Sequence, residues 1–386
     1  MPRKNPGVAG GRRETPPASF YGALRRALRA WFRAHARPLP WRETCDPYAI
    51  WVSEVMLQQT QVATVIPYYQ RFLEAFPTLT HVANAPRERL LELWSGLGYY
   101  RRVRYLHQAA QHLREKFAGR FPDDYASLRA LPGIGDYTAK AVLSIAFHQP
   151  YAVLDGNVAR VVARWFALRG NLHQPKFRRA VERELARLLS RRQPGDFNQA
   201  LMELGQTICL PRAPRCPVCP LRKRCRGFDS GDPATFPLPR PRRATESQYL
   251  AVALLRRGPR VALVRGLDEG LLADLWNFPA AFGRSPTEAR DRLREKLHLL
   301  AHPPFSLGEP VAEFHHTITF RSIRGRVYPV QGCRGIPRGT VRWFDLKRLP
   351  QAAISQLARK IVQKVSGARG GAPRRVRSPR RPRGGR

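Results

Sequence analysis

The stretch "LPGIGDYTA", Leu131–Ala139, decides the fold that this sequence predicts. Its two glycines, Gly133 and Gly135, permit the positive φ angles and the close backbone approach of a tight turn. Apolar residues recur three or four apart in "YASLRA" before the turn and in "TAKAVLSIAF" after it, which predicts a helix on each side. A helix N-terminus at such a turn offers free backbone N–H groups to a phosphate oxygen. We therefore expect a helix-hairpin-helix over residues 125–147, although a lone pair of glycines is more typical of a helix–helix turn without a ligand.

The composition points to a polyanionic partner. The chain has 386 residues and a formal net charge of +40, and nucleic acid is the leading partner for such a balance. The alternative is a genome rich in arginine codons, which would place arginine on any solvated face. No apolar run reaches the roughly 18 to 20 residues of a membrane span, and the N-terminus lacks the apolar segment of a secretory signal. We expect a cytoplasmic protein without a membrane partner.

The periodicity of apolar residues divides the chain into two domains flanked by basic ends. Residues 1–18 and 367–386 are rich in arginine, proline and glycine, and we expect both to be disordered. Residues 19–228 are mostly helical in period and predict an all-α domain. Residues 229–247 break helical patterns and predict a linker. Residues 248–366 alternate strand and helix patterns, which predicts a smaller α/β domain.

Four of the six cysteines lie close together near the end of the helical domain. Their spacing is C-x6-C-x2-C-x5-C, from Cys209 through Cys216 and Cys219 to Cys225. Structural zinc sites commonly use two separated C-x2-C pairs, whereas this loop has one. Four thiolates in one loop suit a [4Fe–4S] cluster, with zinc as the alternative. We expect the remaining two cysteines, Cys45 and Cys333, to be ordinary buried thiols.

Two motifs together resemble a family of DNA repair enzymes. "LPGIGDYTA" and "LDGNVARV", which starts at Leu154, resemble the helix-hairpin-helix–GPD superfamily of base-excision DNA glycosylases, and Asp155 stands at the superfamily's aspartate. The cysteine spacing is also that of the superfamily's cluster loop. Bifunctional members such as endonuclease III carry a lysine nucleophile where this chain has Tyr137. The nearest lysine, Lys140, lies three residues further along, so the resemblance implies a monofunctional glycosylase.

The helix that contains Glu54 makes the resemblance more specific. Glu54 shares a face with Trp51 and Leu57, where burial would raise its pKa as a general acid near pH 7 requires. A glutamate at the edge of the apolar stripe, reaching water, is the alternative. "SEVMLQQTQV" resembles the catalytic helix of the MutY-type adenine DNA glycosylases. "LPWR" at 39–42 and "GLGYYRR" at 96–102 match that family in the same order.

The resemblance implies a role for each of four catalytic residues. Cleavage of an N-glycosidic bond needs an acid for the leaving base and a carboxylate for the cationic sugar, the same division of labour as in glycosidases. By resemblance, Glu54 protonates adenine N7 and helps to activate water. Asp155 stabilises the sugar cation, directly or through a covalent intermediate. Tyr137 hydrogen-bonds near Asp155 and orients it, with Asn157 assisting.

The resemblance also implies a set of DNA contacts. Tyr99 would wedge between bases while Arg101 and Arg102 face phosphates, because the target base must leave the stack. Core packing is the alternative for the aromatic pair, and it suits Tyr100. The other implied contacts are the hairpin glycines Gly133 and Gly135, the residues Leu57, Gln59 and Thr60 near the opposite nucleotide, and the adenine-pocket residues Arg42 and Gln199.

The second domain resembles the Nudix-like C-terminal domain of the same family over "LLADLWNFPAAFG". Its helix "ARDRLREKL" lacks the glutamates that hold Mg²⁺ in Nudix hydrolases, so we expect it to recognise a base and hydrolyse nothing. In the family a Phe-Ser-His-like segment reads 8-oxoguanine. The counterpart here is "HTITF", with Thr319 at the serine position, while Ile318 and Phe320 depart from the pattern. An ordinary strand threonine is the alternative for Thr319.

Taken together, the resemblance covers about residues 20–365 and implies an adenine DNA glycosylase. We expect it to act as a monomer on double-stranded DNA with adenine opposite 8-oxoguanine or guanine, and to associate with the nucleoid when bound. One alternative is an endonuclease III-like bifunctional glycosylase with lyase activity, against which "SEVMLQQTQV" and Tyr137 both speak. A second is a non-catalytic Fe–S DNA-binding protein, which would need neither Glu54 nor Asp155. A third is a nucleotide hydrolase, which the missing acidic helix disfavours.

Overall fold

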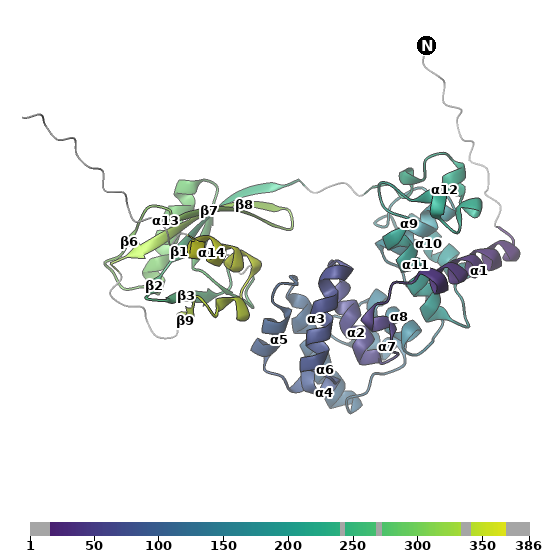
Figure 1. The fold of residues 1–386 in the computed structure, drawn as a ribbon, viewed down its shortest axis with the longest axis horizontal. Helices are drawn as coiled ribbons and strands as arrows, with labels where there is room; N and C mark the ends of the chain where they lie inside the picture. The colour runs from purple at the N-terminus through teal and green to yellow at the C-terminus, as the bar shows by residue number, and fades with distance from the viewer. Residues whose placement is uncertain (1–15, 240–243, 268–271, 333–340, 368–386) are drawn as a thin grey trace, which may run out of the picture. The chain divides into compact units, whose positions relative to one another are not determined.

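The chain folds into two compact units, which are described separately (Figure 1). The structure is a computed structural model that describes residues 16–239, 244–267, 272–332 and 341–367. The first unit comprises residues 1–83 and 108–241, and the second comprises residues 84–107 and 242–386. Most of both expected disordered ends, 1–18 and 367–386, lies outside the described residues.

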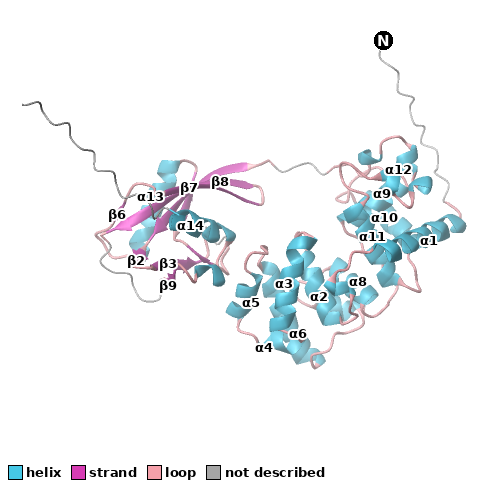
Figure 2. Ribbon diagram, in the orientation of Figure 1, coloured by secondary structure: helices cyan, strands magenta, loops and turns pink. Residues whose placement is uncertain are grey.

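The first unit is helical, as predicted (Figure 2). Its longer helices are α1 (Ala18–His35), α2 (Pro47–Leu57), α3 (Val62–Ala75), α7 (Tyr125–Ala130), α8 (Asp136–Ile145), α9 (Gly156–Trp165), α10 (Pro175–Leu188) and α11 (Pro194–Thr207). Short turns add α4 (Leu79–Asn84), α12 (Arg226–Asp229) and a 3-10 turn at Pro40–Arg42. Helix α6 (Arg101–Phe117) begins in the second unit and continues into the first. One apolar core joins α1, α9, α10 and α11 and contains Leu24, Val162, Val181 and Leu201. Burial of such side chains is the main stabilising term of the unit.

The predicted hairpin connects α7 to α8. Gly133 has φ +74°, in the left-handed region that favours glycine, so a side chain there would be strained. Gly135 has an extended backbone with φ −85° and occupies the N-cap of α8. Arg129 closes the turn by donating to the Ile134 carbonyl at 3.0 Å, and Tyr125 donates to the Asp136 carboxylate at 2.7 Å. Only the first glycine is therefore required by its backbone angle.

The second unit combines two sheets with two longer helices, which confirms the predicted α/β class (Figure 2). In the larger sheet, β1 (Glu246–Leu254) pairs in parallel with β8 (Arg321–Gln331), and three strands pair with them in antiparallel: β5 (Ala280–Gly283), β6 (Ser306–Leu307) and β7 (Ala312–Ile318). The smaller sheet contains β2 (Arg256–Arg257), β3 (Arg260–Arg265), β4 (Trp276–Asn277) and β9 (Arg342–Asp345). Helix α13 (Pro286–Leu300) packs on β1 and β5, and α14 (Gln356–Gly367) packs on β7. The segment α5 (Arg87–Trp94) also belongs to this unit.

The boundary between the two units, after residue 241, falls inside the predicted linker, 229–247, but the first part of that linker packs on the helical unit. Phe236 is buried, and its carbonyl accepts a hydrogen bond from Arg164 Nε at 2.9 Å. The Leu238 amide donates to the Gly170 carbonyl at 2.8 Å. These contacts fasten residues up to 239 to the helical unit, because an aromatic side chain and a paired backbone hold the segment despite its prolines. At the other end β1 begins at Glu246, slightly before the expected start at 248.

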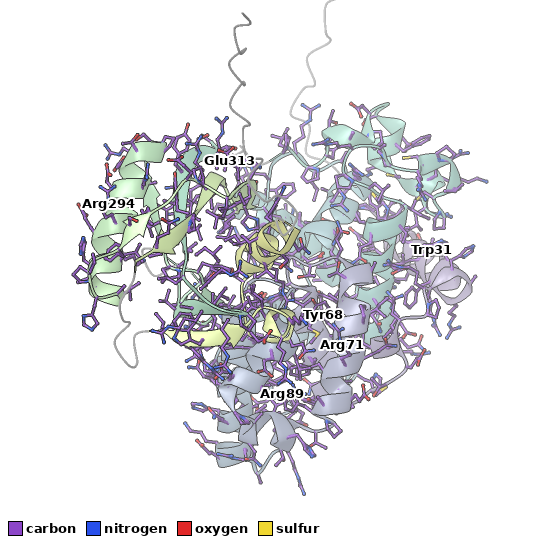
Figure 3. The ribbon with its side chains drawn as sticks, turned by 60° about the vertical axis from the view of Figure 1, so that its left-hand side comes forward. Trp31, Tyr68, Arg71, Arg89, Arg294 and Glu313 are labelled. Atoms are coloured by element: carbon purple, nitrogen blue, oxygen red, sulfur yellow. The ribbon has the colours of Figure 1, made fainter. Side chains whose placement is uncertain are left out.

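The surface of both units carries many of the basic side chains. Arg71 on α3, Arg89 on α5 and Arg294 on α13 are exposed examples (Figure 3). Among the described residues, no helix combines the length and apolar character that crossing a membrane requires.

Candidate active site

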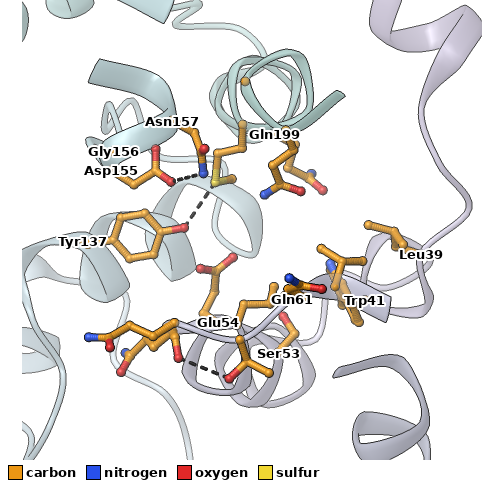
Figure 4. Close-up of a pocket in the computed structure, with 18 of the residues that line it drawn as sticks. Leu39, Trp41, Ser53, Glu54, Gln61, Tyr137, Asp155, Gly156, Asn157 and Gln199 are labelled. Carbon is orange, nitrogen blue, oxygen red and sulfur yellow. Dashed lines mark hydrogen bonds between the residues drawn. The ribbon is translucent and has the colours of Figure 1, made fainter. Parts of the chain in front are cut away.

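A cavity of about 1150 Å³ opens in the first unit beside the hairpin (Figure 4). Residues from α2, α8, α9 and α11 line it, together with the 3-10 turn that contains Arg42. It brings together nearly all the site residues predicted for this unit: Glu54, Tyr137, Asp155, Asn157, Arg42, Leu57, Gln59, Thr60, Gly133, Gly135 and Gln199. Residues that are far apart in the sequence therefore form one concave site, as a binding pocket requires.

Glu54 is the buried acid of this cavity. It lies on α2 and is 5% exposed, and its Oε2 atom has no hydrogen-bond partner within the described part of the chain. Burial is the main cause that raises the pKa of Glu54 to about 7, against a lowering effect of hydrogen bonding with Tyr137 and with a smaller raising effect of the charge of Asp155. Near neutral pH, a carboxyl group with this pKa carries its proton in about half of the molecules, which suits a proton donor. The alternative of an edge glutamate reaching water is therefore wrong.

Asp155 is held rigidly at the start of α9. Its Oδ1 atom accepts the Val158 amide at 2.7 Å as an N-cap, and its Oδ2 atom accepts Asn157 Nδ2 at 2.8 Å. Asn157 in turn accepts a hydrogen bond from Arg160 at 2.9 Å. Both carboxylate oxygens thus have fixed donors, and one of these donors is Asn157, the residue expected to assist Asp155.

Tyr137 contacts a different partner from the one predicted. Its hydroxyl donates to the Met202 sulfur at 3.2 Å (Figure 4), and hydrogen bonding with this hydroxyl lowers the pKa of Glu54. No hydrogen bond between Tyr137 and Asp155 occurs among the described contacts, so the expectation that Tyr137 orients Asp155 is corrected. The reason is that Asp155 already has Asn157 and the α9 backbone as donors, whereas the buried Glu54 lacks another one.

Glu203 is a site residue that the sequence analysis missed. It lies on α11, one turn beyond Gln199, and is 1% exposed. Its carboxylate accepts Arg42 at 2.8 Å and Arg37 at 2.6 Å, and these two arginines lower its pKa against the effect of burial. A charged residue inside the apolar run "ALMELG" is the signal that could have revealed it. Glu203 orients Arg42 at the cavity wall.

The segment between α2 and α3 carries a strained residue. Gln59 has φ +57°, which is uncommon for a residue other than glycine. With Leu57 and Thr60 it lines the rim of the cavity. Strain of this kind persists where the surrounding structure holds it and often marks a functional segment.

Tyr99 and Thr319 lie in the second unit, apart from the cavity residues in the sequence. Tyr99 is 48% exposed and has φ +50°, and Tyr100 is buried as expected. The resemblance implied that Arg102 faces phosphates, but the structure places it elsewhere. It is 7% exposed, and its guanidinium donates to the Gly98 carbonyl at 2.9 Å, because the loop turns its carbonyls inward. Thr319 is exposed at the tip of the β7–β8 hairpin with φ +55°.

The four clustered cysteines line one small cavity between α9 and the loop after α11. Arg164 crosses this loop and donates to the Cys209 sulfur at 3.3 Å and to the Leu210 carbonyl at 2.6 Å. The donor set of four thiols around one cavity fits a thiolate-bound group. In the described ranges no three side chains of the metal-binding types are arranged to hold a single ion, so the fit lies in the type and number of the four donors and not in their present geometry. Cys45 is exposed, which corrects its prediction as buried, and Cys333 lies outside the described residues.

The chain is similar along most of its length to adenine DNA glycosylases. It is 34% identical over 410 residues to the adenine DNA glycosylase of Homo sapiens, an alignment that covers 90% of this chain and 75% of the human protein. The adenine DNA glycosylase of Rattus norvegicus is 33% identical over 399 residues, an alignment that covers 88% of this chain and 77% of the rat protein. Residues 52–191 match the HhH-GPD superfamily of base excision DNA repair proteins. This chain belongs to the adenine DNA glycosylase family.

Two solved structures are similar to parts of this chain. The structure of a thermostable thymine-DNA glycosylase is 26% identical with a TM-score of 0.50, and the match covers 55% of this chain and 98% of that glycosylase. The structure of a MutT Nudix hydrolase from Burkholderia pseudomallei is 18% identical with a TM-score of 0.26, and the match covers 31% of this chain and 98% of that hydrolase. Family membership confirms the predicted enzyme class, a DNA N-glycosylase of base-excision repair, and excludes the non-catalytic alternative.

Proposed function

We propose that this adenine DNA glycosylase removes adenine opposite 8-oxoguanine or guanine by hydrolysis alone, without a lyase step. The observation that carries the proposal is the pairing of the buried acid Glu54 with Tyr137, rather than with an amine, in a cavity that also holds Asp155. A lyase step needs an amine that attacks the sugar. Lys140, the nearest lysine in the sequence, forms an ion pair with Asp136 at 2.9 Å and does not line the cavity.

The residues of the cavity divide the chemistry between them. Glu54 in its protonated form donates a proton to the leaving adenine, and as a carboxylate it then accepts a proton from the attacking water. Asp155, fixed by Asn157 and the α9 N-terminus, places negative charge where the sugar becomes cationic. Arg42, held by Glu203, and Gln199 supply hydrogen-bonding groups for the flipped base.

The cysteine loop is proposed to hold a [4Fe–4S] cluster through Cys209, Cys216, Cys219 and Cys225. The support is the family's relation to endonuclease III together with four thiols that line one cavity. Held in this way, the cluster orders a loop whose arginines, such as Arg222, are placed to meet phosphates. This assigns the cluster a structural role outside the chemistry.

Lesion recognition is proposed for the second unit, through the exposed Thr319 at the hairpin tip. Helix α13 favours base recognition over hydrolysis. Its basic side chains Arg292 and Lys296 donate hydrogen bonds to the carbonyls of Phe282 and Ala280. We further propose that the enzyme works as a cytoplasmic monomer bound to nucleoid DNA.

The test is a defined duplex that contains one 8-oxoguanine:A pair, with G:A, 8-oxoguanine:C and T:A duplexes as controls. Adenine release should be fastest from the 8-oxoguanine:A duplex, and strand cleavage should require alkali. Efficient cleavage without alkali would contradict hydrolysis alone. Equal release from 8-oxoguanine:A and T:A duplexes would contradict mispair recognition.

A further inference from the structure

The loop that carries Tyr99 has a backbone that its own sequence does not explain. Gly96, Gly98 and Tyr99 have φ angles of +114°, +75° and +50°. The two glycines adopt such angles at little cost, whereas a tyrosine in this region carries a conformational strain. A strained residue with an exposed aromatic ring persists only if surrounding contacts hold the loop.

Contacts from α14 reach the base of this loop within the second unit. Ser95 is 6% exposed, and its hydroxyl donates to the Ile354 carbonyl at 3.0 Å and accepts from Arg359 at 2.7 Å. The Gly96 carbonyl accepts Gln356 Nε2 at 3.0 Å. Two hydrogen bonds therefore join two consecutive loop residues to the first turn of α14, and a third joins Ser95 to Ile354 just before that helix.

The α14 side of this contact is itself fixed. Ser355 caps α14 by accepting the Ala358 amide at 2.9 Å, and its hydroxyl donates to the buried Asn277 at 2.6 Å. Ile354 forms a β-bridge with Trp276. The donors that meet the loop thus stand on a hydrogen-bonded part of the β-sheet domain, by which we mean the second unit without residues 84–107.

A second group of contacts holds the helix that leads into the loop. Glu88 on α5 accepts Trp276 Nε1 at 2.9 Å, Arg342 at 3.1 Å and Arg265 at 3.2 Å. All three donors lie in strands of the smaller sheet: Arg265 in β3, Trp276 in β4 and Arg342 in β9. Residues 84–107 are therefore tied to the β-sheet domain at both α5 and the loop, through contacts that are mainly polar.

We propose that the β-sheet domain sets the conformation of the Tyr99 loop, residues 95–99, with Gln356 and Arg359 as positioning residues. This inference rests on the DNA-wedging role implied for Tyr99. The domain that reads the lesion would then also hold the loop that separates bases, so that both acts depend on one rigid element. Positioning of this kind acts through geometry and contributes to rate without any contact to the reacting atoms.

The test uses the full-length double variant Gln356→Ala/Arg359→Ala and measures hydrogen exchange of the free protein. Amides of residues 95–100 should exchange several-fold faster than in the wild type. The control Gln363→Ala/Lys364→Ala changes two exposed residues of the same helix and should leave this exchange unchanged. Arg359→Lys retains a donor and should restore part of the protection. Unchanged loop exchange in the first variant would overturn the proposal.

A double-mutant cycle with Tyr99→Ala then links the loop to function. Single-turnover adenine excision should fall at least about fivefold in Gln356→Ala/Arg359→Ala, because the variant loses two hydrogen bonds and one lost bond already gives about that factor. In the Tyr99→Ala background the same pair of changes should have no further effect. Equal factors in both backgrounds would overturn the proposal. A wild-type enzyme that releases no adenine would instead refute the proposed function, while the exchange result would still decide the inference.

Discussion

The hydroxyl of Tyr137 and the carboxyl of Glu54 both project into the cavity (Figure 4), and hydrogen bonding from Tyr137 lowers the pKa of Glu54 against the larger effect of burial. The same hydroxyl lies 3.2 Å from the Met202 sulfur. A hydroxyl has one proton, so it can donate to the carboxylate when Glu54 is ionised and to the sulfur when Glu54 is protonated. Tyr137 can therefore satisfy both protonation states of the acid.

Glu54→Gln should abolish most catalysis while DNA binding persists. Glutamine keeps the shape of the side chain but carries no transferable proton, and a positioned acid is worth about 10² to 10⁴ in rate. Single-turnover excision and a binding assay on the same duplex measure the two effects. Glu74→Gln, an exposed change on α3, is the control. Excision within tenfold of the wild type would contradict the general-acid role.

Glu54 should also make the protein less stable as pH rises. Its pKa is about 7 in the folded state against 4.5 for the ordinary group, so the folded state binds the proton more tightly. The free energy of unfolding should then fall between about pH 4.5 and pH 7, by at most about 3 kcal/mol. Glu54→Gln should remove this loss and be more stable than the wild type at pH 8. Denaturant unfolding at pH 5 and pH 8 measures it, and equal stabilities of the two proteins at pH 8 would contradict the prediction.

Tyr137→Phe should shift the pH profile of excision toward alkaline pH. The Tyr137 hydrogen bond lowers the pKa of Glu54, so its loss should raise that pKa above about 7. The protonated acid would then survive to higher pH, although the rate itself can fall. Single-turnover rates from pH 5 to pH 9 give the midpoint of the alkaline limb. Tyr68→Phe, on α3, should leave that midpoint unchanged, and a shift toward acid in Tyr137→Phe would refute the assignment.

Tyr137→Lys should convert part of the enzyme to a lyase. The change places an amine in the cavity with Asp155, where burial lowers its pKa and leaves part of it nucleophilic. A Schiff base with the opened sugar should then be trapped by borohydride, with some strand cleavage before alkali. Lys140 is held by Asp136, so the wild type should trap far less. A folded variant that excises adenine without trapping would show that residue 137 does not face the sugar.

Cys219→Ser should destabilise the protein through loss of the cluster. The wild type should contain iron and sulfide in the equal ratio of a [4Fe–4S] cluster, with broad visible absorbance. The variant should lose both and unfold at lower temperature, because the loop would lose a cross-link. Cys45→Ser, at an exposed cysteine outside the loop, should match the wild type in iron content and melting temperature. One zinc per wild-type chain without iron would overturn the assignment.

The sequence by itself determined the enzyme class, the two folds and the eleven predicted site residues that the cavity brings together. Short motifs such as "LPGIGDYTA" and "SEVMLQQTQV" carry this information because each forms locally, from a turn that needs Gly133 or from helical periodicity around Glu54. The cysteine spacing is equally local. These features could be predicted because they depend on neighbours within about one or two helical turns.

Tertiary structure alone decided which partners those residues meet. Tyr137 contacts Glu54 rather than Asp155, and Glu203 holds Arg42 from a helix about 160 residues further along the chain. Arg102 lies inside its loop because the carbonyls of that loop turn inward and need a donor. Burial, charge and hydrogen bonding between distant segments set these choices, and no local pattern encodes them. The sequence therefore names the chemistry, whereas the packing of distant segments assigns each group its partner and its pKa.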